Sequence, residues 1–112
     1  MNPEAPVQRQ LEAYNSRDLQ RFLAEYTEDI QVFRPPSTEP VLSGKHALGE
    51  YYAANRFNLP NLHAKVVNRM VLGNRVVDHE VITGVRTQAF EAAAVYEVAD
   101  GLIQKVWFFN AE

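Results

Sequence analysis

The sequence predicts an α+β fold in which three helices pack on one face of a cone-shaped, curved antiparallel sheet. Helical periodicity is confined to the first half of the chain. The second half alternates between apolar and polar side chains, is rich in β-branched and aromatic residues, and is divided by tight-turn dipeptides. The expected order of elements is ααβαββββ, with a mostly meander sheet, in a single domain over residues 1–112.

The first two helices are expected to end before residue 27. Asn2 can cap the first helix, and the apolar residues of that helix recur at helical spacing at Val7, Leu11 and Tyr14. Asp18 is a favourable N-cap for the second helix. The apolar stripe of the second helix consists of Leu19, Phe22, Leu23 and Tyr26.

A short strand is expected over residues 30–33, followed by an irregular loop over residues 34–43. Three prolines in this loop exclude a helix interior or a central strand. Ser43 and Gly44 open the third helix, which Pro60 prevents from continuing. Whether the loop gates a binding site is left open by the sequence.

Four strands are expected over residues 62–72, 75–87, 89–99 and 102–109. Gly73-Asn74 and Asp100-Gly101 are typical of two-residue hairpin turns, and Thr87-Gln88 marks the middle turn less clearly. Three successive hairpins form an antiparallel meander. A coiled sheet closed by three helices encloses a cone, and the wide end of a cone is a natural pocket.

Composition excludes several classes of function. The chain has no cysteine, which excludes disulfides, thiolate metal sites and a cysteine nucleophile. The net charge is −3 and the basic residues are scattered, so nucleic-acid binding is not expected. No apolar stretch approaches the roughly 20 residues of a membrane span. The first residues do not resemble a signal peptide, so we expect a cytoplasmic protein.

No metal or cofactor is expected either. The three histidines lack ligand-like spacing, and His46 and His63 are expected to be exposed. No glycine-rich phosphate loop is present.

Local segments resemble the nuclear-transport-factor-2-like superfamily, which includes ketosteroid isomerases and SnoaL-like polyketide cyclases. Residues 14–19 resemble its helix junction, residues 27–32 its helix-to-strand turn, residues 40–48 the entry to its third helix, and residues 73–84 the SnoaL-like hairpin. The resemblance covers nearly the whole chain. It implies a small-molecule pocket and cofactor-free proton transfer on a hydrophobic or ring-bearing substrate: isomerisation, cyclisation or dehydration. The alternatives are a non-catalytic ligand-binding domain and a dimeric interaction module with a vestigial pocket.

The ketosteroid isomerase mechanism itself is not expected. The catalytic aspartate of that family falls at Arg34, its oxyanion-hole tyrosine at Gln10, and its protonated aspartate near Ala94. A carboxylate base and two acidic donors do the work in that mechanism, and all three are missing here.

His79 and Arg34 are the candidate catalytic residues. Strand alternation places His79 on one face and Asp78 and Glu80 on the other. The His79 face is more apolar, so we expect His79 to face the core as acid or base and the two carboxylates to face solvent. The opposite register would line the pocket with both carboxylates as substrate-binding groups. Arg34 would stabilise an anion, with a surface or dimer salt bridge as the alternative.

Tyr14, Tyr52 and Phe108 complete the candidate substrate-binding set. Helical stripes point both tyrosines at the cavity, although plain core packing is the alternative for each.

The last strand is apolar on both faces. Its outer residues, Trp107 and Phe109, predict a two-fold homodimer through the outer sheet face. The alternative is that loops of the same chain cover this strand. Residues 110–112 follow without another helix, which predicts a pocket that is open or is closed by the 34–43 loop.

Overall fold

The computed structural model describes residues 2–110 and confirms the α+β architecture. The helices are α1 (Glu4–Asn15), α2 (Leu19–Leu23) and α3 (Lys45–Asn55). The strands are β1 (Tyr26–Phe33), β2 (Leu42–Ser43), β3 (His63–Leu72), β4 (Arg75–Thr83), β5 (Phe90–Ala99) and β6 (Leu102–Asn110). The expectation about the chain end concerns residues 111–112, which lie outside the described residues.

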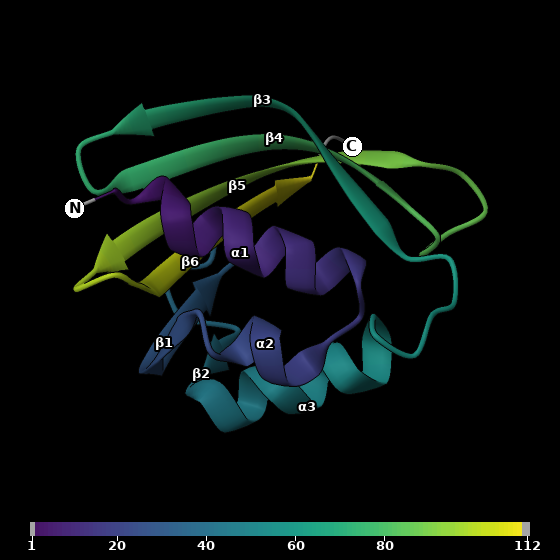
Figure 1. The fold of residues 1–112 in the computed structure, drawn as a ribbon, viewed down its shortest axis with the longest axis horizontal. Helices are drawn as coiled ribbons and strands as arrows, with labels where there is room; N and C mark the ends of the chain where they lie inside the picture. Colours follow the sequence, from purple (N-terminus) through teal and green to yellow (C-terminus); the bar gives the residue numbers. More distant parts are fainter. Residues whose placement is uncertain (1, 111–112) are drawn as a thin grey trace.

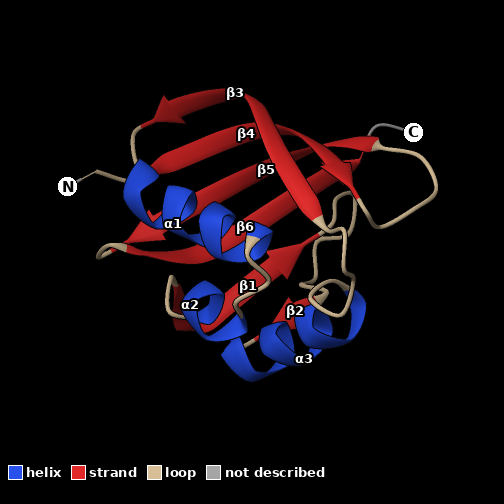
Figure 2. Ribbon diagram, turned by 45° about the vertical axis from the view of Figure 1, so that its right-hand side comes forward, coloured by secondary structure: helices blue, strands red, loops and turns tan. Residues whose placement is uncertain are grey.

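All three helices lie on the same side of one curved, unclosed sheet (Figure 2). The strand order is β2-β1-β6-β5-β4-β3. Strands β3 to β6 form the predicted antiparallel meander, but β1 pairs with β6 in parallel, so the sheet is mixed. Local alternation does not encode which distant strand is a partner, so the pairing of β1 with β6 could not be predicted.

The second helix is shorter than predicted. Asp18 caps α2 as expected, since its side chain accepts a hydrogen bond from the backbone N–H of Arg21. The helix ends at Leu23, and Tyr26 begins β1 instead of completing the helical stripe. Pairing of Tyr26 with Ile103 of β6 explains the difference, because tertiary pairing overrides a local period.

The turns of the meander follow the prediction at two of three positions. Gly73-Asn74 and Asp100-Gly101 form tight turns, and both residues of the second turn have positive φ, as a type I′ turn requires. The middle connection is longer than a two-residue turn and spans residues 84–89. It begins at Gly84, where φ is +82° and an added Cβ would collide with the backbone carbonyl oxygen of Asn61.

An aromatic cluster joins the helices to the sheet. Helix α1 crosses the inner sheet face, while α2 and α3 pack beside each other near β1 (Figure 1). Phe22 of α2 is fully buried, with its ring centroid 4.7 Å from that of Tyr52 and 4.9 Å from that of Tyr26. Such contacts fix the tyrosine rings on the wall of the cavity described below. In the described part of the chain, no helix has the length and apolar character that crossing a membrane requires.

Candidate functional site

A cavity lies between the inner face of the sheet and the helices. The space open to the centre of a water molecule is about 70 Å³, and the site opens to solvent on one side. The helices contribute Tyr14, Phe22, Tyr51 and Tyr52 to its wall, and the strands contribute Tyr26, Phe90, Tyr96 and Phe108. Tyr14, Tyr52 and Phe108 therefore lie where the sequence predicted them. The cavity is narrow and bounded by flat rings, with charged and polar side chains among them.

The predicted orientation of strand β4 was wrong. His79 lies on the outer face with 48% of its side chain exposed, and its Nε2 is 2.6 Å from a carboxylate oxygen of Glu91. Asp78 and Glu80 face inward and are 0% and 5% exposed. The apolar neighbours of His79 misled the prediction because the outer face of this sheet is itself apolar. His46 and His63 are exposed, as expected.

Among the described residues, Glu80 is the one carboxyl group on the wall of this cavity. Within residues 2–110, its side chain forms no hydrogen bond or ion pair. Its cross-strand neighbours are Val66 and Ala92, which offer no partner. Burial raises the pKa of Glu80 to about 7; the negative charge of Asp78 adds to the shift, and Arg69 opposes it. This group can therefore accept or donate a proton near neutral pH.

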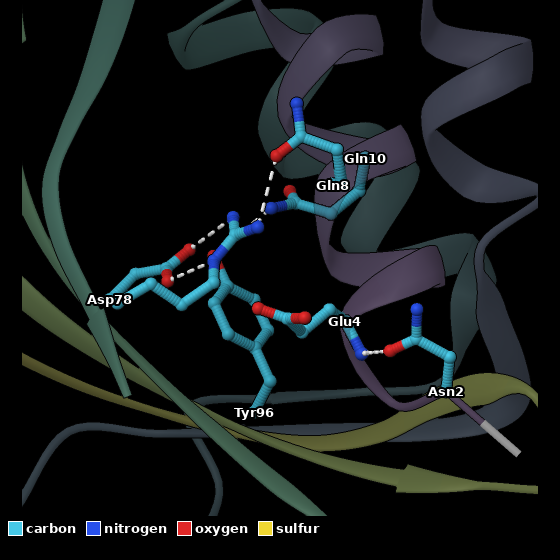
Figure 3. A network of polar contacts seen from close by, with 7 residues as sticks. Asn2, Glu4, Gln8, Gln10, Asp78 and Tyr96 are labelled. Carbon is cyan, nitrogen blue, oxygen red and sulfur yellow. Dashed lines mark hydrogen bonds and ion pairs between the residues drawn. The ribbon is translucent and has the colours of Figure 1, made fainter. Parts of the chain in front are cut away.

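Asp78 is held in a buried ion pair rather than at the cavity surface. Arg69 of β3 donates two hydrogen bonds to its carboxylate, at 2.7 and 3.0 Å, and a third to the side-chain oxygen of Gln8 at 2.9 Å. Figure 3 shows this network beside Gln10 and Tyr96. The pairing keeps a negative charge two residues from Glu80, on the same face of the strand.

Gln10 links two buried tyrosines and was missed as a site residue. The hydroxyl of Tyr26 donates to the side-chain oxygen of Gln10, and the Gln10 amide donates to the hydroxyl oxygen of Tyr96, both at 3.2 Å. Tyr96 donates no hydrogen bond within residues 2–110, so its proton remains available to a ligand. Burial raises the pKa of Tyr26 and of Tyr96, and the charge of Glu80 adds to both shifts. Both hydroxyls therefore stay protonated at neutral pH.

Burial also raises the pKa of Tyr14, to about 12, against the opposing charge of Arg56. The pKa of Tyr52 is raised by burial and by its proximity to Tyr14. The two predicted tyrosines are thus neutral hydroxyls on the cavity wall at physiological pH.

Three arginines surround the cavity. Arg34 lies there as predicted, with its guanidinium carbon 5.3 Å from the ring centroid of Phe108. Arg56 and Arg86 also line the cavity but were missed. Arg56 directly follows α3, and Arg86 lies in the 84–89 connection. No sequence motif marks either position. No group of three or more histidine or acidic side chains in the described part of the chain could hold a metal ion.

The outer face of the sheet carries a continuous apolar row. The strand register aligns Met70, Val77, Val95, Trp107 and Phe33 across five neighbouring strands. The rings of Phe33 and Trp107 stack with centroids 5.5 Å apart. Phe109 extends the apolar surface and is 45% exposed.

Comparison with known proteins identifies a domain family and solved structures of the same fold. A model of the SnoaL-like domain family matches residues 7–106. No curated protein matches the chain at a significant level.

Solved structures share the fold at low sequence identity. An uncharacterised cystatin-fold protein from Novosphingobium aromaticivorans is 22% identical, with a TM-score of 0.88 over 97% of this chain and 98% of that one. A SnoaL-like protein of unknown function from Burkholderia thailandensis is 19% identical, with a TM-score of 0.82 over 98% and 94%. A computationally designed 17-OHP binder is 13% identical, with a TM-score of 0.83 over 100% and 94%. At these identities, the likeness establishes the architecture alone.

Proposed function

Because this chain belongs to the SnoaL-like domain family, we propose that it catalyses cofactor-free proton transfer on a small hydrophobic or ring-bearing molecule. The observation that carries the proposal is Glu80. Its carboxyl group lies on the cavity wall without a hydrogen-bond partner in the described chain, and its pKa is raised to about 7. A group whose pKa is near the working pH exchanges protons most effectively. Glu80 therefore takes the role that the sequence had assigned to His79.

The proposed reaction begins at a carbon–hydrogen bond next to a substrate carbonyl. The Glu80 carboxylate takes that proton, and the bonding electrons move to the carbonyl oxygen to form an enolate. The hydroxyl of Tyr96 donates a hydrogen bond to the enolate oxygen, and Arg34 adds positive charge at the exposed side of the same cavity. Protonated Glu80 then returns the same proton to another carbon of the conjugated system, which isomerises the substrate. Tyr14, Tyr52 and Phe108 hold the ring.

The proposal is tested by deuterium exchange into 2-tetralone, a ring ketone with acidic carbon–hydrogen bonds, followed by NMR in D₂O. We expect Glu80→Gln to lower the catalysed rate by about 100-fold or more, because an amide cannot accept the proton. The wild-type rate should rise with pH and level off above about 7, as Glu80 loses its proton.

His79→Gln is the matched control, since it removes a titratable group from the neighbouring position on the outer face, and its rate should equal that of the wild type. An unchanged rate in Glu80→Gln would refute the assignment. Saturable binding of 2-tetralone without any exchange would instead favour the ligand-binding alternative.

The outer face supports a second part of the proposal, a two-fold homodimer. An apolar row of five strands, with Phe109 beside it, exceeds the scattered apolar residues of an ordinary surface. A second copy of the same face would cover it economically, because a two-fold axis pairs one surface with itself.

We expect light scattering after size-exclusion chromatography to give twice the 12.7 kDa of one chain. Val95→Glu, at the centre of the row, should yield the monomer, because a charge buried in an apolar interface is costly. Ala53→Glu is the control: Ala53 is exposed on α3, which lies on the opposite side of the sheet from the row, and its substitution should leave the dimer intact. A wild-type monomer would contradict this part of the proposal.

A further inference from the structure

We propose that the ligand of this cavity is a flat, conjugated organic acid whose carboxylate binds the three arginines while its ring system lies between the aromatic walls. The inference names the substrate class of the proton-transfer site and, as a statement about substrate, rests on the proposed function. The binding geometry from which it is argued does not depend on catalysis.

Each arginine is held over an aromatic ring that lines the same cavity. Arg34 lies over Phe108, Arg86 over Phe90 at 4.2 Å, and Arg56 over Tyr51 at 5.9 Å from guanidinium carbon to ring centroid. These are the cation–π pairs found within residues 2–110. The three arginines come from separate segments, namely the end of β1, the end of α3 and the 84–89 connection. Stacking on a ring leaves N–H donors at the guanidinium edge open to a ligand, although Arg56 spends one of its donors on the backbone oxygen of Asn55 at 2.8 Å.

The same three arginines form no ion pair within the described residues. By contrast, Arg9, Arg69 and Arg75 each pair with a carboxylate at 2.7 to 2.9 Å. In residues 2–110, the charged groups of the cavity wall are these three arginines and Glu80. The whole chain has a net charge of −3, so positive charge is gathered at this cavity against the overall balance. Such a site attracts and orients anions.

The depth of the charges sets the orientation of the ligand. Arg34 and Arg86 are exposed, whereas Glu80 is buried. An anionic group would thus stay at the solvent side, and the apolar body would reach inward toward Glu80. A planar carboxylate fits the planar fork of a guanidinium in a bidentate manner.

The interior favours a flat body. Aromatic rings bound the cavity, and the small side chains of Ala64 and Ala92 on the sheet leave room against its inner face. The narrow free space favours a flat body over a bulky one.

Isothermal titration calorimetry with matched acid and amide probes tests the inference. The acids are benzoate, trans-cinnamate and 2-naphthoate, and each is compared with its neutral amide of nearly the same shape. We expect at least one acid to bind about ten-fold tighter than its amide at pH 7 and low salt, because hydrogen bonds from arginine to a carboxylate are stronger than those to a neutral amide. Phenyl phosphate serves as a third arm; if it binds tighter than benzoate, the anionic group is a phosphate and the carboxylate assignment is overturned.

Substitution of the arginines identifies the source of the preference. Arg34→Gln, Arg56→Gln and Arg86→Gln should each reduce acid binding several-fold while leaving amide binding unchanged. Arg75 is a surface arginine paired with Glu97, and Arg75→Gln should change neither acid binding nor amide binding. Equal binding of acid and amide, binding of neither up to millimolar concentration, or a preference that survives all three substitutions together would overturn the inference.

The Glu80→Gln variant separates this inference from the proposed function. If the variant retains the preference for acids but loses deuterium exchange, both the substrate class and the proton-transfer role of Glu80 are supported. If Glu80-dependent exchange occurs without any acid preference, the substrate class is wrong and the proton-transfer role survives. If the acid preference is present and exchange does not depend on Glu80, the site binds organic acids without the proposed chemistry.

Discussion

Asp78→Ala is expected to lower the free energy of unfolding by about 3 kcal/mol or more. The substitution removes both hydrogen bonds from Arg69 and leaves its guanidinium, held in a side chain that is 16% exposed, without a counter-charge. Breaking one partner of a buried pair costs about 3–5 kcal/mol, because the remaining charge stays desolvated. Urea unfolding at pH 7, followed by circular dichroism, measures the change.

The matched control is Glu97→Ala, which breaks a cross-strand pair with Arg75 that makes one hydrogen bond, at 2.9 Å, and whose arginine side chain is 52% exposed. Exposed pairs contribute about 0–1 kcal/mol, so the control should be close to the wild type. Asp78→Asn keeps one hydrogen-bond acceptor, so its free energy of unfolding should lie between those of Asp78→Ala and Glu97→Ala. Equal stability of Asp78→Ala and Glu97→Ala would show that the Asp78–Arg69 pair does not hold β3 to β4.

Glu80→Gln is expected to stabilise the folded protein at pH 8 by about 3 kcal/mol. In the wild type the pKa of Glu80 is about 7 in the folded state, against 4.5 when unfolded. The unfolded chain therefore loses this proton first as the pH rises, and the free energy of unfolding falls between about pH 4.5 and 7. Glutamine has no proton to lose, so the variant escapes this penalty.

Urea unfolding at pH 5, 6, 7 and 8 should show a difference between variant and wild type that is smallest at pH 5 and largest at pH 8. Glu39→Gln, in the exposed 34–43 loop, removes a carboxylate from the surface and should show no such widening. Parallel pH curves for Glu80→Gln and the wild type would mean that Glu80 is not desolvated. A stabilising loss of activity is typical of a functional group kept in an unfavourable environment.

Most of the fold could be predicted because its determinants are local. The cap at Asp18 and the turns at Gly73-Asn74 and Asp100-Gly101 depend on neighbouring residues alone. The parallel pairing of β1 with β6 and the two-residue strand β2 could not be predicted, since both depend on residues distant in sequence. The early end of α2 has the same origin.

The candidate site was predicted less completely than the fold. Tyr14, Tyr52, Phe108 and Arg34 all line the cavity; helical stripes indicate this position for the two tyrosines, and Arg34 was expected there because it directly follows the first strand. The orientation of β4 could not be read from alternation, since an apolar outer face and a carboxylate-bearing inner face reverse the usual pattern. Arg56 and Arg86 reach the cavity only through the tertiary arrangement of two connections.

The parallel contact between β1 and β6 also bears on how the chain acquires its structure during synthesis. Residues 26–33 leave the ribosome well before residues 102–110, so β1 must wait for a partner strand while its edge is unpaired. Contacts so distant in sequence slow folding, because a long loop must close before they form. The helices and β1 therefore emerge as a segment that is prone to aggregation, and chaperone binding to nascent chains should be strongest before β6 appears.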